Sequence, residues 1–358
     1  MVVALRKREV VILPTRVLAK GLLNGVSRAQ QRDTGDYIEK SQLDIRCAAT
    51  GICFDGLRIS FMDRRTFLAT AAGVAVSPLK AAMPATIIDT HTHFYDPTRP
   101  QGVPWPPKTD NILYRPVLPA EFVKLTRSLG ITGTIEVEAS QWLEDNQWVL
   151  DLAAGNPIIV GTVGDLEPGK PDFRKNLARF HKNPLFRGIR LGTSLLDRSL
   201  GDLKALAEAG LELDAIGGPP LLPHVVRLTD EVPDLRIVIN HLPFDPPADE
   251  AARAVYQAAL RELGKRPQVY AKVSNVPRRS GDRVPEEVSF YRPSLDELWD
   301  IFGPDRVIYG SNWPVSARIA PYQVAFNIVR EYFTAKGPEA VEKYFWKNSQ
   351  AAYRWRRI

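Results

Sequence analysis

The chain has 358 residues, of which 44% are hydrophobic and 25% are charged, and these ordinary globular values exclude a disordered or fibrous protein. The net charge of +6 lies in the first 84 residues, since residues 85–358 carry 34 basic and 34 acidic side chains. A region without net charge lacks the attraction to phosphate that nucleic-acid binding requires, so we expect no nucleic-acid partner. Both cysteines, Cys47 and Cys53, precede this region, which excludes a disulfide framework or a cysteine nucleophile within it.

Residues 62–84 have the order of a secretory signal. The pair Arg64-Arg65 precedes an apolar run from Phe67 to Leu79, which is too short for a bilayer core that needs about 20 residues. We therefore expect no stable transmembrane helix. Basic, apolar and small residues in this order are typical of export signals, and the string RRTFL resembles a twin-arginine signal. This resemblance implies the twin-arginine export machinery as a partner and a periplasmic or secreted location; a helix start with two chance arginines is the alternative.

Residues 1–61 show no motif that indicates a function. Because a signal belongs at the N-terminus, we interpret Met62 as the true start and residues 1–61 as translated upstream sequence. A genuine N-terminal extension is the alternative. The folded domain is expected over residues 85–358.

Eight short β-branched or apolar runs alternate with helical stretches in this domain. Such runs suit strands that are buried on both faces of a parallel sheet. The alternation predicts an α/β fold, a closed (β/α)₈ TIM barrel, which typically takes about 250 residues. A doubly wound open sheet is the rival, but no glycine-rich phosphate loop follows the first strand. The predicted strands are residues 85–94, 131–140, 158–166, 186–192, 211–217, 236–242, 269–275 and 306–315.

Apolar residues at helical spacing predict helices over 146–155, 202–210 and 247–264, each with a glycine at its end. Two long loops, 95–118 and 276–292, follow the first and seventh strands. Loops after the strands of a barrel lie on the face where catalysis occurs, so we expect both to border the active site.

The strongest chemical signal is the string Asp89-Thr90-His91-Thr92-His93 at the end of the first strand. Alternate residues of a strand point to the same side, so both histidines are expected to face the barrel mouth, about 6–7 Å apart. Two imidazoles that converge on one point suit a borderline cation such as zinc.

The string IIDTHTHFYDP resembles the opening of the amidohydrolase superfamily, in particular its amidohydrolase-2 branch. Three later segments resemble further parts of that branch in the expected order: 233–247 its sixth strand, 306–315 its eighth strand and 347–355 its C-terminal helix. The most similar subgroup is that of the fuconolactonases and 2-pyrone-4,6-dicarboxylate lactonases. The resemblance implies a hydrolase that opens a sugar or dicarboxylate lactone by water attack.

The resemblance also implies one divalent metal ion, zinc before others, on His91, His93 and His241; a metal-independent site is the alternative. Arg190 could hold a substrate carboxylate or lactone oxygen, and a structural ion pair with Glu138 or Asp165 is its alternative reading. The predicted catalytic residues are Glu138, Arg190, His241 and Asn312, and the predicted substrate-binding residues are Arg190 and an aromatic wall of Tyr95, Trp105 and Trp313.

Two departures from the family pattern limit this prediction. Asn312 stands where the family has an aspartate that binds metal and takes a proton, and an amide cannot accept a proton at neutral pH. The fifth predicted strand carries no histidine and only Asp214 as a polar candidate, so a two-metal centre is not expected. The other polar candidates, Lys272 as a structural residue and His181 and His224 as surface or packing histidines, are not assigned to the site.

Two other functions stay open. A decarboxylase of the same branch normally needs a histidine in the fifth strand and the eighth-strand aspartate, and this chain lacks both. A secreted binding barrel with a degenerate site is favoured by Asn312 and opposed by the three predicted ligand histidines.

Overall fold

The structure is a computed structural model that describes residues 3–6, 9–12 and 83–356. The chain divides into two compact units, Met1–Leu79 and Lys80–Ile358. In the first unit, strands β1 (Val3–Arg6) and β2 (Glu9–Ile12) pair in antiparallel fashion. The predicted signal lies outside the described residues apart from its last two positions, so the twin-arginine motif stays a prediction. No helix in the described ranges is long and apolar enough to cross a membrane.

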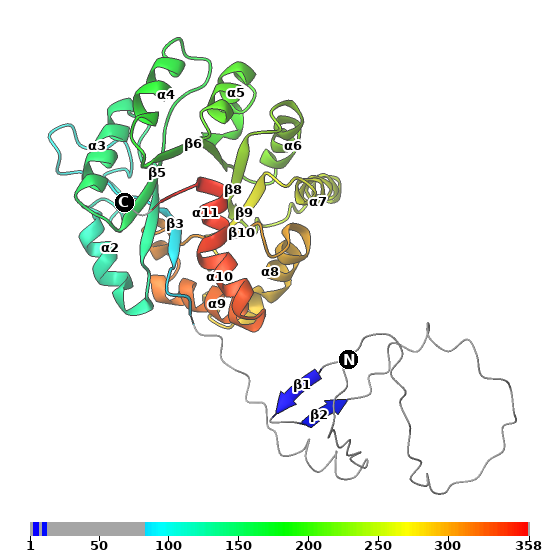
Figure 1. Ribbon diagram of the computed structural model, residues 1–358. Helices are drawn as coiled ribbons and strands as arrows, with labels where there is room; N and C mark the ends of the chain where they lie inside the picture. Colours follow the sequence, from blue (N-terminus) through cyan, green and yellow to red (C-terminus); the bar gives the residue numbers. More distant parts are fainter. Residues whose placement is uncertain (1–2, 7–8, 13–82, 357–358) are drawn as a thin grey trace, which may run out of the picture. The chain divides into compact units, whose positions relative to one another are not determined.

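The second unit contains one sheet of eight parallel strands with helices arranged around it, which confirms the predicted (β/α)₈ barrel (Figure 1). The strands are hydrogen-bonded in sequence order, and every one overlaps a predicted strand. They are β3 (Ile88–Thr92), β4 (Gly133–Val137), β5 (Ile159–Gly164), β6 (Phe186–Gly192), β7 (Glu212–Ile216), β8 (Arg236–Leu242), β9 (Val269–Val273) and β10 (Val307–Tyr309).

The first and last barrel strands meet through a few polar contacts rather than a long ladder. Thr92 and Trp313 form an isolated parallel bridge. The backbone N–H of His93 donates to Trp313 O at 3.0 Å, and Thr90 Oγ1 donates to Tyr309 O at 2.6 Å. The ring of strands is therefore nearly closed, with the histidine-bearing end of β3 held against the segment after β10.

Helices of the outer layer separate successive strands. They include the three predicted helices, but the clearest of these begins later than expected: α7 starts at Glu250 because the Asp249 side chain caps it by accepting from Ala252 N at 2.8 Å. The outer helices are α2 (Pro119–Thr126), α3 (Leu143–Ala154), α4 (Phe173–His181), α5 (Leu200–Glu208), α6 (Leu221–Glu231), α7 (Glu250–Gly264), α8 (Val288–Phe302) and α9 (Tyr322–Ala335).

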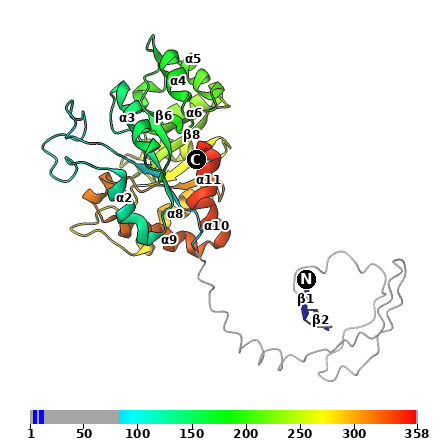
Figure 2. The ribbon, with the colours of Figure 1, turned by 60° about the vertical axis from the view of Figure 1, so that its left-hand side comes forward.

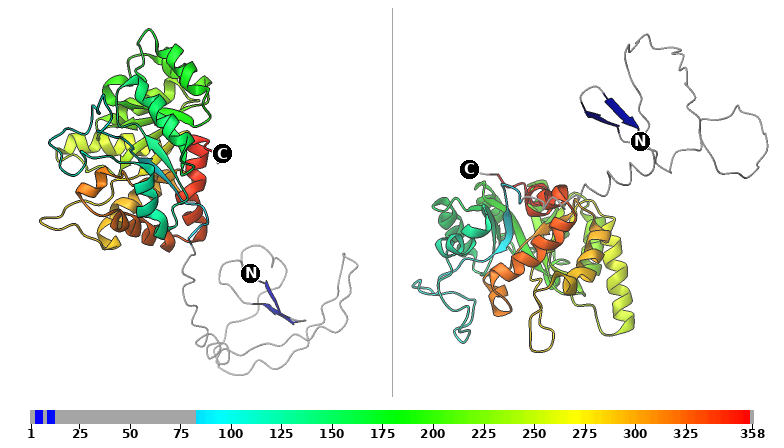
Figure 3. Two further views of the ribbon diagram at one scale, coloured as in Figure 1. Left: turned by 90° about the vertical axis from the view of Figure 1, so that its left-hand side faces the viewer. Right: turned by 90° about the horizontal axis from the view of Figure 1, so that it is seen from below.

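Two C-terminal helices, α10 (Pro338–Glu342) and α11 (Asn348–Tyr353), cover one end of the barrel. Arg236, the first residue of β8, donates to Ala352 O at 2.7 Å, which places α11 at the N-terminal ends of the strands. The long loops after β3 and β9 project at the opposite end (Figures 2 and 3). The barrel is thus plugged at one end, and its functional side is the end at which the strands finish.

Candidate active site

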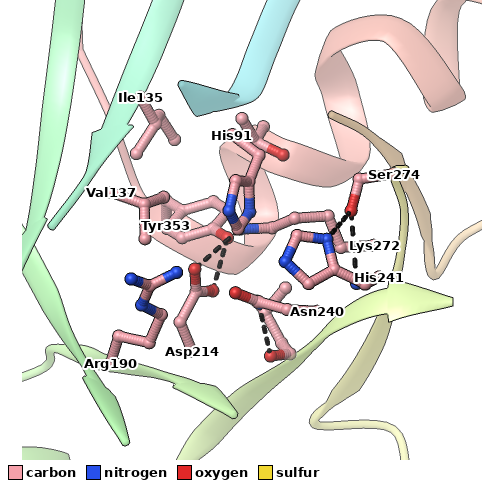
Figure 4. A network of polar contacts seen from close by, with 12 residues as sticks. His91, Ile135, Val137, Arg190, Asp214, Asn240, His241, Lys272, Ser274 and Tyr353 are labelled. Atoms are coloured by element: carbon pink, nitrogen blue, oxygen red, sulfur yellow. Dashed lines mark hydrogen bonds and ion pairs between the residues drawn. The ribbon is translucent and has the colours of Figure 1, made fainter. Parts of the chain in front are cut away.

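Three histidines gather at this end of the barrel. His91 lies on β3, His93 directly follows β3, and His241 lies near the end of β8. The ring centroids of His91 and His93 are 5.0 Å apart, and those of His91 and His241 are 4.5 Å apart. Figure 4 shows the rings of His91 and His241 pointing into the same space. His241 has a positive φ of 63°, a conformation that non-glycine residues adopt rarely and mostly at functional sites.

Burial keeps these three rings neutral. It lowers the pKa of His93 to about 3, and it lowers the pKa values of His91 and His241 well below that of a free histidine. The cations Arg190 and Lys272 lower all three pKa values further, since each disfavours a second positive charge nearby. At neutral pH each ring therefore offers one N–H donor and one lone pair.

Each ring is fixed through its Nδ1 atom. His93 Nδ1 lies 2.7 Å from Val137 O, and His241 Nδ1 lies 3.0 Å from Ser274 Oγ. His91 Nδ1 lies 3.3 Å from Lys272 Nζ. By contrast, His91 Nε2 is buried and has no hydrogen-bond partner among the protein groups, a condition that points to a bound water, ion or ligand, or to a catalytic role.

Lys272 belongs to a buried network beneath the histidines. Its Nζ lies 2.7 Å from Asp214 Oδ2, and both side chains are fully buried. Tyr353, from α11, donates to Asp214 Oδ1 at 2.7 Å. Burial lowers the pKa of Lys272, and the Asp214 carboxylate opposes that change. The sequence predicts Lys272 to be structural, and its contact with His91 was not predicted. A lysine within an otherwise apolar buried strand was the available signal, because a buried ammonium group needs polar partners.

Arg190 and Glu138 form an ion pair at the rim. Arg190 Nε donates to Glu138 Oε1 at 2.7 Å, and Arg190 Nη2 donates to the backbone oxygen of the same residue at 2.7 Å. The side chains are 12% and 20% exposed. Arg190 was predicted either to bind substrate or to form an ion pair with Glu138 or Asp165, and the structure shows the ion pair with Glu138. Asp165 lies nearby, and burial followed by repulsion from Glu138 raises its pKa to about 7.

The aromatic residues predicted to form a wall separate into two groups. Trp105 is half-buried, with its ring centroid 6.0 Å from that of His93 and 5.3 Å from that of Tyr95. Tyr95 lies behind it and donates its hydroxyl to Leu113 O at 2.9 Å. The Trp313 ring packs on Phe94 and Phe122 in the hydrophobic core, so it supports the site from behind.

Asn312 lies beside His93. Its Oδ1 atom is 3.3 Å from His93 Nε2, its side chain is buried, and its backbone has a positive φ of 59°. Asp89 was not predicted as part of this arrangement, yet its carboxylate accepts from Ser311 N at 2.8 Å and from Tyr322 Oη at 2.9 Å. Burial raises the pKa of Asp89 to about 6. Asp89 thus ties β3 to the segment that carries Asn312.

Comparisons with known proteins agree with this geometry. Residues 88–355 match the amidohydrolase family. The chain belongs to the amidohydrolase family. It is 30% identical over 237 residues to an L-fucono-1,5-lactonase of Burkholderia ambifaria, covering 64% of this chain and 80% of that protein. It is 28% identical over 257 residues to a 4-sulfomuconolactone hydrolase of Hydrogenophaga intermedia, covering 67% and 78%. An amidohydrolase of Burkholderia multivorans solved with zinc shares the fold, with a TM-score of 0.67 at 22% identity over 76% of this chain and all of that one.

The residues of this amidohydrolase do not fit a metal ion in the way the sequence implied. Among the described residues, no group of three or more His, Cys, Asp or Glu side chains is arranged to hold one. The Lys272 ammonium already supplies a positive charge 3.3 Å from His91 Nδ1. The eighth-strand position offers the neutral Asn312 amide, which is a weaker ligand than a carboxylate. The predicted zinc site on His91, His93 and His241 therefore remains a prediction that the geometry opposes.

Proposed function

We propose that this amidohydrolase is a lactone hydrolase. The observation that carries the proposal is the cluster of three neutral histidines at the functional end of the barrel, in which His91 and His93 are buried, His241 is half-buried, and His91 Nε2 is unpartnered. In the reaction, water adds to the carbonyl carbon of a cyclic ester, the ring C–O bond breaks, and the ring oxygen receives a proton to give a hydroxy acid. Neutral imidazoles suit both halves, because they can donate to the carbonyl oxygen and accept a proton from water. The activities of the two lactone-hydrolysing relatives support the same class.

A neutral sugar lactone suits the rim of the site better than a dicarboxylate lactone. The Arg190 guanidinium is already engaged by Glu138, so it does not offer a free fork to a substrate carboxylate. Glu138 and Asp165 bring carboxyl oxygens to this edge that accept hydrogen bonds from hydroxyl groups, and Glu138 offsets the charge with which Arg190 would attract a carboxylated ligand. We therefore propose a polyhydroxylated lactone as the substrate.

A pH-indicator screen of sugar lactones and carboxylated lactones tests the proposal. We expect the purified protein to hydrolyse at least one sugar lactone, and each of His91→Ala, His93→Ala and His241→Ala to reduce the rate by at least about 10²-fold. His181→Ala is the matched control, because His181 is exposed on α4. Full activity in the three site variants, or no hydrolysis of any lactone, would refute the proposal.

Neither alternative function gains support from the site. For a decarboxylase, the fifth strand offers no histidine; it carries Glu212 and Asp214, and Asp214 is engaged by Lys272 and Tyr353. For a binding barrel with a degenerate site, the three histidines would not need partners that fix each ring. The rim and the histidine cluster favour hydrolysis over both.

We also propose export through the twin-arginine machinery to the periplasm or beyond. The support is the RRTFL string at residues 64–68, followed by the apolar run.

A further inference from the structure

Lys272 is a cation that the protein itself places inside the barrel, against the first histidine of the cluster. Its Nζ is 2.7 Å from Asp214 Oδ2 and 3.3 Å from His91 Nδ1 (Figure 4). An ammonium group only donates hydrogen bonds. His91 Nδ1 therefore accepts, and the single proton of the neutral ring is on Nε2, the atom that is buried without a partner.

We infer that Lys272 holds His91 in the tautomer whose Nε2–H donates to the lactone carbonyl oxygen, so that hydrolysis needs no metal ion. The inference rests on the proposed lactonase function. His91 is then a catalytic residue and Lys272 is the residue that positions its proton. A nitrogen that carries a proton has no lone pair for a metal, and the lone pair of Nδ1 faces the ammonium group.

His93 has the opposite tautomer. A carbonyl oxygen only accepts, so the 2.7 Å contact with Val137 O requires the proton on His93 Nδ1 and leaves a lone pair on Nε2. Asn312 Oδ1, 3.3 Å from this nitrogen, is also an acceptor, so it makes no hydrogen bond to the unprotonated Nε2 and leaves the lone pair available. Two rings 5.0 Å apart therefore present one donor and one acceptor to the same space.

With His91 as the hydrogen-bond donor and His93 as the proton acceptor, every proton and bond of the hydrolysis is accounted for. Water attacks the carbonyl carbon and passes a proton to His93 Nε2, while His91 Nε2–H stabilises the charge that forms on the carbonyl oxygen. When the carbonyl re-forms, the ring C–O bond breaks. The departing ring oxygen takes the proton from His93, and the hydroxy acid is released. The proton of His91 stays on its ring throughout.

The barrel is shaped to hold this contact. Gly310 passes so close that a Cβ atom there would lie 2.9 Å from His91 Cβ and 3.3 Å from Lys272 Cδ. On the other side, Tyr353 from the plugging helix donates to Asp214, which orients the carboxylate toward Lys272. The space left by Gly310 and the oriented Asp214 carboxylate together keep the ammonium group against His91.

Nitrogen-15 NMR of the wild-type protein tests the tautomers directly, because the chain has only five histidines. The variants His181→Gln and His224→Gln, on the outer helices α4 and α6, remove two signals and simplify assignment. We expect a proton on Nε2 of His91 and on Nδ1 of His93. A proton on Nδ1 of His91 would overturn the inference, whether or not the protein hydrolyses lactones. The expected tautomers in a protein that hydrolyses no lactone would instead refute the lactonase proposal and, with it, the role at the carbonyl.

Conservative variants separate a donor from a metal ligand. His91→Gln keeps an N–H donor and should retain activity within about 10-fold, whereas His91→Phe removes the donor and should lose about 10²–10³-fold.

The pair Lys272→Met with Asp214→Asn removes both buried charges together, so neither is left unpaired. This pair should release the His91 tautomer in the NMR spectrum and increase zinc affinity about 10-fold relative to wild type. Lys336→Met with Asp296→Asn, a pair at the surface, is the control. Stoichiometric zinc in wild type that His91→Gln removes would overturn the inference.

Discussion

Asn312 occupies the position at which the family pattern has an aspartate, in contact with His93 Nε2 at 3.3 Å. A carboxylate there would face the lone pair of His93 and draw a proton onto the ring. We expect Asn312→Asp to convert the base into an imidazolium, to reduce the lactonase rate at pH 7 by at least about 10-fold, and to lower the free energy of unfolding by about 1–3 kcal/mol.

Kinetics and thermal unfolding of this variant measure both effects. Asn275→Asp is a close control, because Asn275 also has a positive φ, of 56°, but is exposed. A faster enzyme with raised zinc content would show that the family's water-activating scheme applies to this chain after all.

Glu138 decides whether Arg190 is free to bind a carboxylate. Glu138→Gln removes the negative charge that engages the guanidinium at 2.7 Å. We expect the ratio of kcat/KM for carboxylated over neutral lactones to rise about 10-fold, because the rim gains a net positive charge. Steady-state kinetics on one lactone of each kind measures the ratio, with Glu144→Gln on the exposed face of α3 as control. An unchanged ratio would mean that Arg190 does not contact the substrate.

At the scale of the elements, the backbone directly after β10 passes close to His91. At Gly310, a Cβ atom would lie 2.9 Å from His91 Cβ and 3.2 Å from Ser274 Cβ, and neither of these atoms can move without its backbone. Gly310→Ala should therefore displace the histidines, destabilise the fold by about 1–3 kcal/mol and reduce the rate. Gly155→Ala is the control, since its nearest contact would be an ordinary 3.9 Å. Wild-type stability and rate in Gly310→Ala would contradict the geometry around His91.

The elements of the barrel could be predicted from sequence because strands that are buried on both faces of a parallel sheet consist of short, nearly continuous apolar runs. Every strand from β3 to β10 overlaps its prediction. The contacts between elements could not be predicted in the same way. That Lys272 reaches His91, 181 residues away in sequence, depends on barrel closure and on which face of β9 is inward. The start of α7 also differs from the predicted residue 247, because the Asp249 side chain caps the helix and α7 begins at Glu250.

At the scale of the whole molecule, the export signal can be tested apart from the barrel. The twin-arginine machinery reads the arginine pair itself, so Arg64→Lys with Arg65→Lys should keep the protein in the cytoplasm although the charge is unchanged. Fractionation of expressing cells, with detection of the full chain in each compartment, measures the effect. A lysine variant with the same periplasmic yield as wild type would remove the twin-arginine proposal.

The stability of the whole barrel should depend on pH through Asp165. Burial, and then Glu138, raise the pKa of Asp165 to about 7, whereas an unfolded chain has an aspartate pKa near 4. The folded state therefore binds the proton more tightly. The stability that this contributes is fully present below about pH 4 and is lost as the pH rises through about 7.

Asp165→Asn cannot ionise, so its stability relative to wild type should increase from about pH 4 to about pH 7 and then stay constant. The gain should be on the order of 1–3 kcal/mol, less than the full shift implies because the side chain is partly exposed. Denaturant unfolding at a series of pH values measures it, and Asp151→Asn, on the exposed face of α3, controls for the loss of one charge. In a Glu138→Gln background the window should move to lower pH, because the repulsion between the two carboxylates is gone. A stability difference that does not vary with pH would show that the folded protein ionises Asp165 as easily as the unfolded chain does. Asp165 would then be negatively charged beside Glu138 at neutral pH.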